Sequence, residues 1–163
     1  LMDFNENRLK IIGKAFHCLM EFSPDLINLN IEKAQQLIID FPLSTADQAL
    51  VLNSIKKLNE SEKCSNLLNN SDANYILTES EWANEFGDTL RPDRIDFNTQ
   101  NKTIQIIDFK WRLNEEKTLL YISQLLNYRK VIELYHPKMS FKSFLVSGDA
   151  QIAYVEGDQL LHL

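Results

Sequence analysis

The sequence is poor in glycine and cysteine, and it has no long apolar run. Only four of its 163 residues are glycine. None has the GxxxxGK[ST] spacing of a Walker loop, so an ATP-driven motor is not expected within this segment. Cys18 and Cys64 lie far apart without CxxC spacing, which argues against a disulfide framework, a zinc site or an iron–sulfur cluster. No apolar run approaches the roughly 20 residues that cross a bilayer, and the N-terminus lacks a signal-peptide pattern. We therefore expect a cytoplasmic protein that has no membrane partner.

Length and composition fit one folded unit. With 44% hydrophobic and 25% charged residues, the chain can bury one core and is too short to need two domains. We expect residues 1–163 to form a single domain, mainly helical over 1–72, with a meander, a crossover helix and returning strands over 73–163. Leu1 stands before Met2, which leaves two interpretations open: a remnant ahead of a natural start, or an excised piece of a longer chain.

Charge is distributed unevenly along the chain. The formal net charge of −6 argues mildly against a protein that coats nucleic acid through bulk charge. Residues 91–142, however, carry ten basic and six acidic side chains. This locally basic segment fits a nucleic-acid partner, and by itself it fits an ordinary solvated surface equally well.

The first half of the chain has the apolar spacing of helices. Three helices and a shorter helical or irregular piece are expected, at about 5–22, 31–39, 44–58 and 60–68. Pro24 follows the first of them, and Ser44 opens a capping-box pattern for the third. A polar turn over 69–72 ends the helical half.

After that turn the apolar pattern alternates, as in strands. Strands are expected at 75–82, 93–97, 103–110, 141–146 and 151–155. A helix that is apolar nearly all round spans 119–135 and ends before Pro137. Gly157-Asp158 suggests a last turn. This order predicts an α/β fold with a central mixed β-sheet flanked by helices.

Two neighbouring strands carry acidic residues in a pattern that suggests chemistry. A two-residue turn at Gln100-Asn101 would place Asp93 opposite Asp108, at a Cβ separation of about 5 Å. Alternation puts Lys110 on the same face as Asp108 and turns Asp96 to the opposite face. The same register pairs apolar residues on one face: Phe97 with Ile104 and Ile95 with Ile106. The register therefore separates a candidate metal ligand, Asp93, from a bystander, Asp96.

Two carboxylates held this close repel each other and need compensation. A divalent cation compensates them well, and Mg²⁺ or Mn²⁺ prefers such oxygen ligands. Together with the ammonium of Lys110, this set predicts phosphodiester hydrolysis. The alternative is a surface hairpin with ordinary salt bridges, from Asp108 to Lys110 or from Arg91 to Asp93. The second aspartate in register, within a basic segment, favours the catalytic interpretation.

Four motifs follow one another in an order known from a nuclease family. They are Gly13-Lys14-Ala15-Phe16-His17, Pro92-Asp93, Ile107-Asp108-Phe109-Lys110 and Gln124-Leu125-Leu126-Asn127-Tyr128. On these motifs the chain, from about residue 9 to 146, resembles the PD-(D/E)XK nuclease superfamily and its RecB-type branch. It is similar to the C-terminal nuclease domains of exodeoxyribonuclease V beta-like helicases. Leu90, Phe109 and Trp111 depart from the family pattern, which has glycine, tyrosine and threonine or serine there. The resemblance implies a restriction-endonuclease-like fold.

The resemblance also implies roles for single residues. His17 would be a further metal ligand, with Gly13 leaving room beside its imidazole, and the backbone carbonyl of Phe109 would ligate as well. Without the resemblance, His17 reads as a histidine packed on an apolar helix. The family usually has a glutamate near Glu79 and Glu81, and we favour Glu79.

Gln124 and Tyr128 lie one helical turn apart, so both can face one cleft and contact the DNA backbone or the catalytic groups. Their alternative reading is a surface hydrogen bond and a core tyrosine. The expected nucleic-acid contacts are Arg91, Arg94, Arg112, Gln124 and Tyr128. The expected catalytic set is Asp93, Asp108, Lys110, Gln124, Tyr128 and Glu79, and the expected metal ligands are His17, Asp93, Asp108 and the Phe109 carbonyl.

The function that the resemblance implies is a Mg²⁺- or Mn²⁺-dependent exonuclease acting on DNA in recombination or repair. A helicase motor is expected in the same full-length chain or in a partner subunit. The cysteine cluster that binds iron–sulfur in some relatives is missing, so that cofactor is not expected. Two alternatives stay open: an inactive nuclease-like module that binds DNA or serves as a scaffold, and a stand-alone structure-specific endonuclease or a nuclease acting on RNA.

Overall fold

The first half of the molecule is helical, as expected. The computed structural model describes residues 3–22, 29–70 and 72–163. Pro24, expected after the first helix, and Ser71, part of the expected polar turn, therefore lie outside the described residues. The helices are α1 (Phe4–Phe22), α2 (Ile31–Ile38), α3 (Thr45–Glu60) and α4 (Glu62–Leu68), whose ends lie within two residues of the expected ones. Side chains of Asn30, Ser44 and Ser61 cap α2, α3 and α4 by accepting hydrogen bonds from backbone N–H groups of the first turn. None of the described helices has the length and apolar character needed to cross a membrane.

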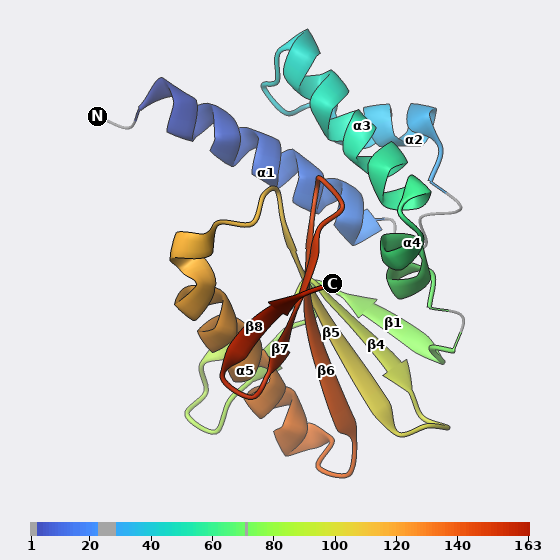
Figure 1. Cartoon of the computed structure of the whole chain (residues 1–163), viewed down its shortest axis with the longest axis vertical. Coiled ribbons are helices and arrows are strands. Elements are labelled where there is room, and N and C mark those ends of the chain that lie inside the picture. The colour runs from blue at the N-terminus through green and yellow to red at the C-terminus, as the bar shows by residue number, and fades with distance from the viewer. Residues whose placement is uncertain (1–2, 23–28, 71) are drawn as a thin grey trace.

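Six strands form a central mixed sheet in the order β1-β4-β5-β6-β7-β8 (Figure 1). They are β1 (Tyr75–Thr78), β4 (Arg94–Asn98), β5 (Thr103–Lys110), β6 (Ser140–Ser147), β7 (Ile152–Glu156) and β8 (Gln159–His162). β5 and β6 are parallel, and the connection between them runs through a short 3₁₀ turn, η2 (Glu115–Lys117), and helix α5 (Thr118–Tyr135). The other neighbouring pairs are antiparallel. The expected α/β class is confirmed, and the arrangement is consistent with a restriction-endonuclease-like fold.

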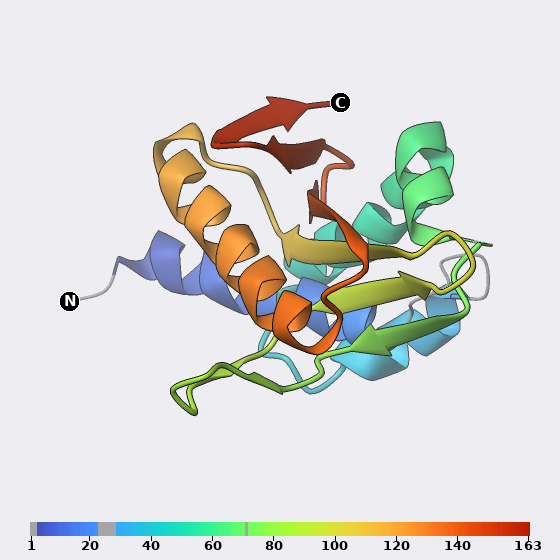
Figure 2. The ribbon, with the colours of Figure 1, turned by 90° about the horizontal axis from the view of Figure 1, so that it is seen from below.

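The sheet separates two helical layers. Helices α1 to α4 pack on one side of it and α5 on the other (Figures 1 and 2). Alternate residues of β5 enter opposite cores: Ile106 packs in the core that contains Leu125 of α5, while Phe109 packs in the core that contains Phe16 of α1. Both faces of β5 are therefore buried, and residues near its end lie between α1 and α5.

The structure corrects three details of the strand prediction. The strand expected over 75–82 ends at Thr78, because Glu79 turns the chain with a φ of 50°. The following residues form a separate small sheet of β2 (Trp82–Ala83) and β3 (Thr89–Leu90). The connection from β4 to β5 has four residues, 99–102, instead of two, and the turn at Gly157 leads into a further strand, β8.

The register expected between β4 and β5 is confirmed. Ile95 pairs with Ile106 and Phe97 with Ile104, because the longer turn is centred on the same two residues as the expected one. Asp96 pairs with Gln105 in the same ladder, on the face opposite to the α5 core. It therefore points away from Lys110 and its neighbours.

Asp96 forms a buried ion pair with Arg94. The Arg94 Nε lies 2.6 Å from Asp96 Oδ1, and both residues are only 1% exposed. The Arg94 guanidinium also donates a hydrogen bond of 2.6 Å to the backbone oxygen of Leu68, at the end of α4. The pair joins the sheet to the helical layer.

Replacement of Asp96 by asparagine should therefore destabilise the fold. Asp96→Asn leaves the Arg94 charge buried without its counter-ion, so we expect the free energy of unfolding to fall by about 3–5 kcal/mol in urea denaturation. Glu60→Gln, which breaks the exposed Lys56–Glu60 pair, is the control and should change it by less than about 0.5 kcal/mol. An Asp96→Asn loss as small as that of the control would contradict the structural role of the pair.

Candidate functional site

Asp93 and Asp108 come together where β4 begins and β5 ends. Arg94 pairs with Ile107, so the residue before Arg94 lies beside the residue after Ile107, as the register predicts. The Phe109 N–H donates a hydrogen bond of 2.6 Å to Asp93 Oδ2, which holds this carboxylate against the end of the sheet. Asp108 is 2% exposed. The fold thus places two acidic side chains at one buried point.

His17 and Glu79 approach Asp93 from two other elements. One donor atom from each of these three side chains lies within 4.8 Å of the other two, and His17 Nδ1 is 3.4 Å from Asp93 Oδ2. The bend at Glu79 is held by its N–H, which donates to the Asp93 backbone oxygen at 3.0 Å. A positive φ at a non-glycine residue costs about 1 kcal/mol or more, so the bend is a feature that the surrounding contacts must maintain. Glu81 is exposed, and the structure therefore brings together the favoured glutamate and not its neighbour.

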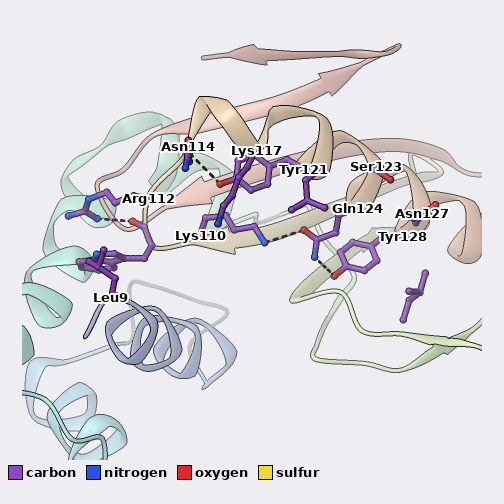
Figure 3. A pocket seen from close by; sticks show the side chains of 13 residues that line it. Leu9, Lys110, Arg112, Asn114, Lys117, Tyr121, Ser123, Gln124, Asn127 and Tyr128 are labelled. Carbon is purple, nitrogen blue, oxygen red and sulfur yellow. Dashed lines mark hydrogen bonds between the residues drawn. The ribbon is translucent and has the colours of Figure 1, made fainter. Parts of the chain in front are cut away.

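A chain of polar contacts runs from Asp108 into helix α5. Lys110 Nζ lies 2.7 Å from Asp108 Oδ2 and donates a hydrogen bond of 3.1 Å to Gln124 Oε1. Gln124 Nε2 then donates to the hydroxyl of Tyr128 at 2.9 Å, and Figure 3 shows Lys110, Gln124 and Tyr128 in this line. Lys110 has only donors, so the Gln124 oxygen must face it and the amide nitrogen must face Tyr128. Gln124 and Tyr128 lie one turn apart on α5, so Tyr128 can fix the Gln124 amide, and Gln124 in turn orients the ammonium of Lys110.

The two aspartates titrate in opposite directions. Burial raises the pKa of Asp108, and the charge of Asp93 raises it further, to about 7, although Lys110 acts against both. Burial acts on Asp93 in the same sense, but the contact with His17 and the Phe109 N–H outweigh it, so the pKa of Asp93 is lowered. Asp93 is therefore charged at neutral pH, while Asp108 is partly protonated.

Neighbouring groups respond to the same negative charge. Burial and then the charge of Asp93 raise the pKa of Glu79. Burial, together with the charges of Asp108 and Asp93, raises the pKa of Tyr128, which keeps its hydroxyl protonated. Burial lowers the pKa of His17, but Asp93 and Asp108 more than compensate and the net shift is upward. All these shifts indicate a site with an excess of negative charge.

The residues fit a divalent cation. Asp108 Oδ2 is buried and, among the described residues, forms no hydrogen bond, although it touches the Lys110 ammonium as an ion pair. The ammonium compensates part of this buried charge, and the pKa of Asp108 is still raised, so a further cation nearby would be favourable. The carboxylates of Glu79 and Asp93 and the imidazole of His17, whose donor atoms lie within 4.8 Å of one another, form a donor set that Mn²⁺ and Mg²⁺ accept, and Asp108 stays a predicted ligand beside them. The Phe109 carbonyl stays a predicted further ligand.

Two hollows flank this cluster. The first, of about 670 Å³, lies between the end of β5 and helix α5 (Figure 3). The second, of about 730 Å³, lies beside α1 and contains His17 and Glu79. Lys110, Trp111 and Lys117 line both. Lys110 is therefore accessible from both hollows, whereas His17 and Glu79 line only the second and Gln124 and Tyr128 only the first.

Trp111 is held at the border of the two hollows by a glycine. A Cβ added to Gly148 would lie 2.6 Å from the Trp111 ring, so no other residue fits there without displacing the indole. Around Gly13 the nearest atom is the Trp111 Cβ, at 3.9 Å from an added Cβ. The expectation that Gly13 makes room for the His17 imidazole is therefore wrong, because the space beside it faces the tryptophan.

The three arginines expected to bind nucleic acid differ in accessibility. The Arg91 side chain is 60% exposed, and its Nε donates to the Glu79 backbone oxygen at 2.9 Å. The Arg112 guanidinium lies 4.1 Å from the centre of the Trp111 ring and lines the first hollow. Arg94 is buried in its ion pair with Asp96, so its predicted contact with nucleic acid is wrong.

Several lining residues escaped the prediction from sequence. Lys10 and Lys14 line the second hollow, and Lys117 lines both. The spacing of Lys10, Lys14 and His17 along one helical face is a signal that could have identified the first two. Trp111 and Lys117 belong to the site only through the path that the chain takes after β5.

Comparisons with known proteins yield a weak likeness. No protein-family model matches the sequence, and no curated protein matches it. Among solved structures, the chain is similar to a protein from Eubacterium rectale named "Putative exonuclease", with a TM-score of 0.49 and 14% sequence identity. The match covers 90% of this chain and 59% of the other, so the chain spans less than two thirds of that neighbour. A likeness of this strength leaves the function to be argued from the residues of the site.

The raised pKa of Asp108 predicts a pH-dependent gain in stability when its charge is removed. Between about pH 4 and 7 the folded protein keeps a proton that the unfolded chain has lost, so this group lowers stability as the pH rises through that window. In chelator-treated protein at pH 8, Asp108→Asn should raise the free energy of unfolding by roughly 2–4 kcal/mol. The gain should shrink towards pH 4.

Denaturant unfolding at several pH values measures this gain. Asp158→Asn, at the exposed turn before β8, is the matched control and should show no gain that depends on pH. A gain from Asp108→Asn that is the same at pH 4 and pH 8 would rule out charge burial as its cause.

The donor set predicts which carboxylates bind metal. In a calorimetric Mn²⁺ titration, Asp93→Asn and Glu79→Gln should weaken binding at least about tenfold, because each removes an oxygen of the cluster. Glu81→Gln, two residues from Glu79 and exposed, is the control and should leave the affinity unchanged. Asp96→Asn, assayed under conditions where it is folded, should also leave the affinity for Mn²⁺ unchanged. Equal losses for Asp93→Asn and Asp96→Asn would contradict the assignment from the strand register.

Proposed function

We propose that this chain is a deoxyribonuclease that hydrolyses phosphodiester bonds with the help of Mg²⁺ or Mn²⁺. The observation that carries the proposal is Asp108, a buried carboxylate between Asp93 and Lys110 whose pKa is raised to about 7. A carboxylate in that environment destabilises the fold unless its charge is used. Binding of a cation and a phosphate at this point would use it.

The proposed roles follow from the contacts of each residue. His17, Glu79, Asp93 and Asp108 would hold the cation, which when bound polarises the phosphate and lowers the pKa of water. The Lys110 ammonium, 2.7 Å from Asp108 Oδ2, can neutralise charge that develops on the phosphate oxygens or orient the attacking water.

Gln124 and Tyr128 act as positioning residues in this proposal. Gln124 accepts a hydrogen bond from Lys110 and so limits where the ammonium can lie. Tyr128 accepts from Gln124, which leaves its own O–H free to donate. Since the pKa of Tyr128 is raised, its hydroxyl stays protonated at neutral pH and can donate a hydrogen bond to a phosphate oxygen.

The finer features of the proposal rest on the family resemblance. We propose an exonuclease that works in DNA recombination or repair beside a helicase motor, in the same full-length chain or in a partner subunit. An inactive DNA-binding or scaffold module would not require such a costly cluster of charges. A stand-alone endonuclease or a nuclease acting on RNA uses the same phosphate chemistry, so substrate assays must separate these alternatives.

Removal of the two central charges should abolish cleavage. With linear DNA and Mn²⁺ or Mg²⁺, Asp108→Ala and Lys110→Ala should each lower the rate by about a hundredfold or more, since each removes a group that acts on the reacting phosphate. Lys130→Ala, on α5 and outside both hollows, is the control and should retain activity. Circular dichroism should show that all three variants are folded.

Substrate comparison completes this test. A ribo-oligonucleotide of the same sequence, run in parallel, distinguishes DNA from RNA as substrate, and circular DNA distinguishes endonuclease from exonuclease action. If the wild type binds DNA without metal-dependent cleavage, the inactive-module alternative replaces the proposal.

A further inference from the structure

Helix α1 presents two lysines beside the candidate metal cluster. Lys10, Lys14 and His17 have i, i+4 and i+7 spacing and therefore lie on one face of the helix. All three line the second hollow, together with Glu79 and Lys110. Both lysine side chains are exposed, and neither forms an ion pair with a carboxylate of residues 3–22, 29–70 or 72–163. Their charges are therefore available to a ligand.

The charge along this face changes sign at His17. One turn beyond His17, Glu21 lines the same hollow. In the other direction the positive stretch ends at Glu6, which lines a smaller hollow with Lys10 and Lys117. Lys117, at the end of η2, adds a positive charge to the lining of the second hollow and of this smaller one. Along α1, Lys10 and Lys14 thus lie on one side of His17, and Glu21 lies on the other.

We propose that Lys10 and Lys14 form a track for two backbone phosphates on one side of the bond that is cut. The inference rests on the proposed nuclease function, and the track is defined by these two lysines. With the reacting phosphate at the His17–Glu79–Asp93 cluster, the next phosphate would lie over Lys14 and the following one over Lys10. One helical turn separates the two lysines by about 6 Å along the axis, similar to the step between successive phosphates of an extended strand.

The sidedness of the track has a consequence for the product. Glu21 repels phosphates on the far side of the cluster, where no lysine of the track compensates it. A strand is then held firmly in only one direction from the cut. The piece on the other side of the cut would be held less firmly after cleavage.

Salt-dependent binding tests the track without requiring turnover. Fluorescence anisotropy of a labelled single-stranded DNA oligonucleotide, in the absence of metal, gives the dissociation constant at several salt concentrations. Lys10→Gln and Lys14→Gln should each weaken binding about three- to tenfold at low salt and reduce the slope of log Kd against log salt by about 0.7. Lys130→Gln is the matched control and should change neither, whereas Lys14→Arg should restore the slope.

Neutral phosphates test which side of the cut is held. The cut is first mapped with the wild type and Mn²⁺, and methylphosphonates then replace single phosphates on either side of it. On the track side, the first replacement should raise KM for the wild type but have no further effect on Lys14→Gln. Replacement of the second phosphate on the track side should likewise raise KM for the wild type and have no further effect on Lys10→Gln. Replacement of a phosphate on the other side of the cut should change KM less than replacement on the track side. The lysine variants should differ from the wild type in KM, with kcat within about twofold.

The outcomes separate this inference from the proposed function. Unchanged salt slopes for both lysine variants, or equal effects of neutral phosphates on the two sides, would overturn the track even if the wild type cleaves DNA. Absence of cleavage with normal, lysine-dependent binding would overturn the nuclease proposal and support the track as a phosphate-binding surface.

Discussion

The pairing of β4 with β5 is the constraint on which the site depends. In the observed register Ile95, Phe97, Ile104 and Ile106 all face the α5 core, and this register sets Asp93 beside Asp108 at the end of the ladder. A slip of one residue would turn the apolar side chains out of their core. The hydrophobic free energy of that face therefore forces two carboxylates together against their repulsion. The contacts of His17 and Lys110 with this pair, and the raised pKa of Asp108, follow from this proximity.

The two helical layers contact the Asp93–Asp108 pair from opposite sides of the sheet. From α5, Gln124 holds Lys110 close to Asp108, and from α1, His17 approaches Asp93. The two layers together compensate the charge only in part, since the pKa of Asp108 stays raised. The geometry of the site thus depends on the packing of both helical layers against the sheet. The protein couples its own folding to the geometry of the charged cluster.

Features fixed by local pattern could be predicted from sequence, and features fixed by distant contacts could not. Alternation and turn position were sufficient for the β4–β5 register and for the separation of Asp93 from Asp96. The bend at Glu79 could not be anticipated, because a positive φ at glutamate is maintained by the hydrogen bond to Asp93 and not by its own preference. The burial of Arg94 depends on the Leu68 carbonyl, 26 residues away. A charged residue beside a motif is easily mistaken for a surface residue when its partner lies in another layer.

The lysines that line the hollows belong to a chain whose net charge is −6, so the local and the overall charge have opposite signs. At about 0.1 M salt, charges act over roughly 10 Å, so Lys14 and Lys117 attract a phosphate only when it has already entered the hollow. Farther away, a strand meets an acidic protein and is not drawn in by long-range attraction. The proposed site would therefore favour a strand that is delivered to it. This charge distribution fits the proposed association with a motor that moves DNA, because delivery by a partner removes the need for capture from solution.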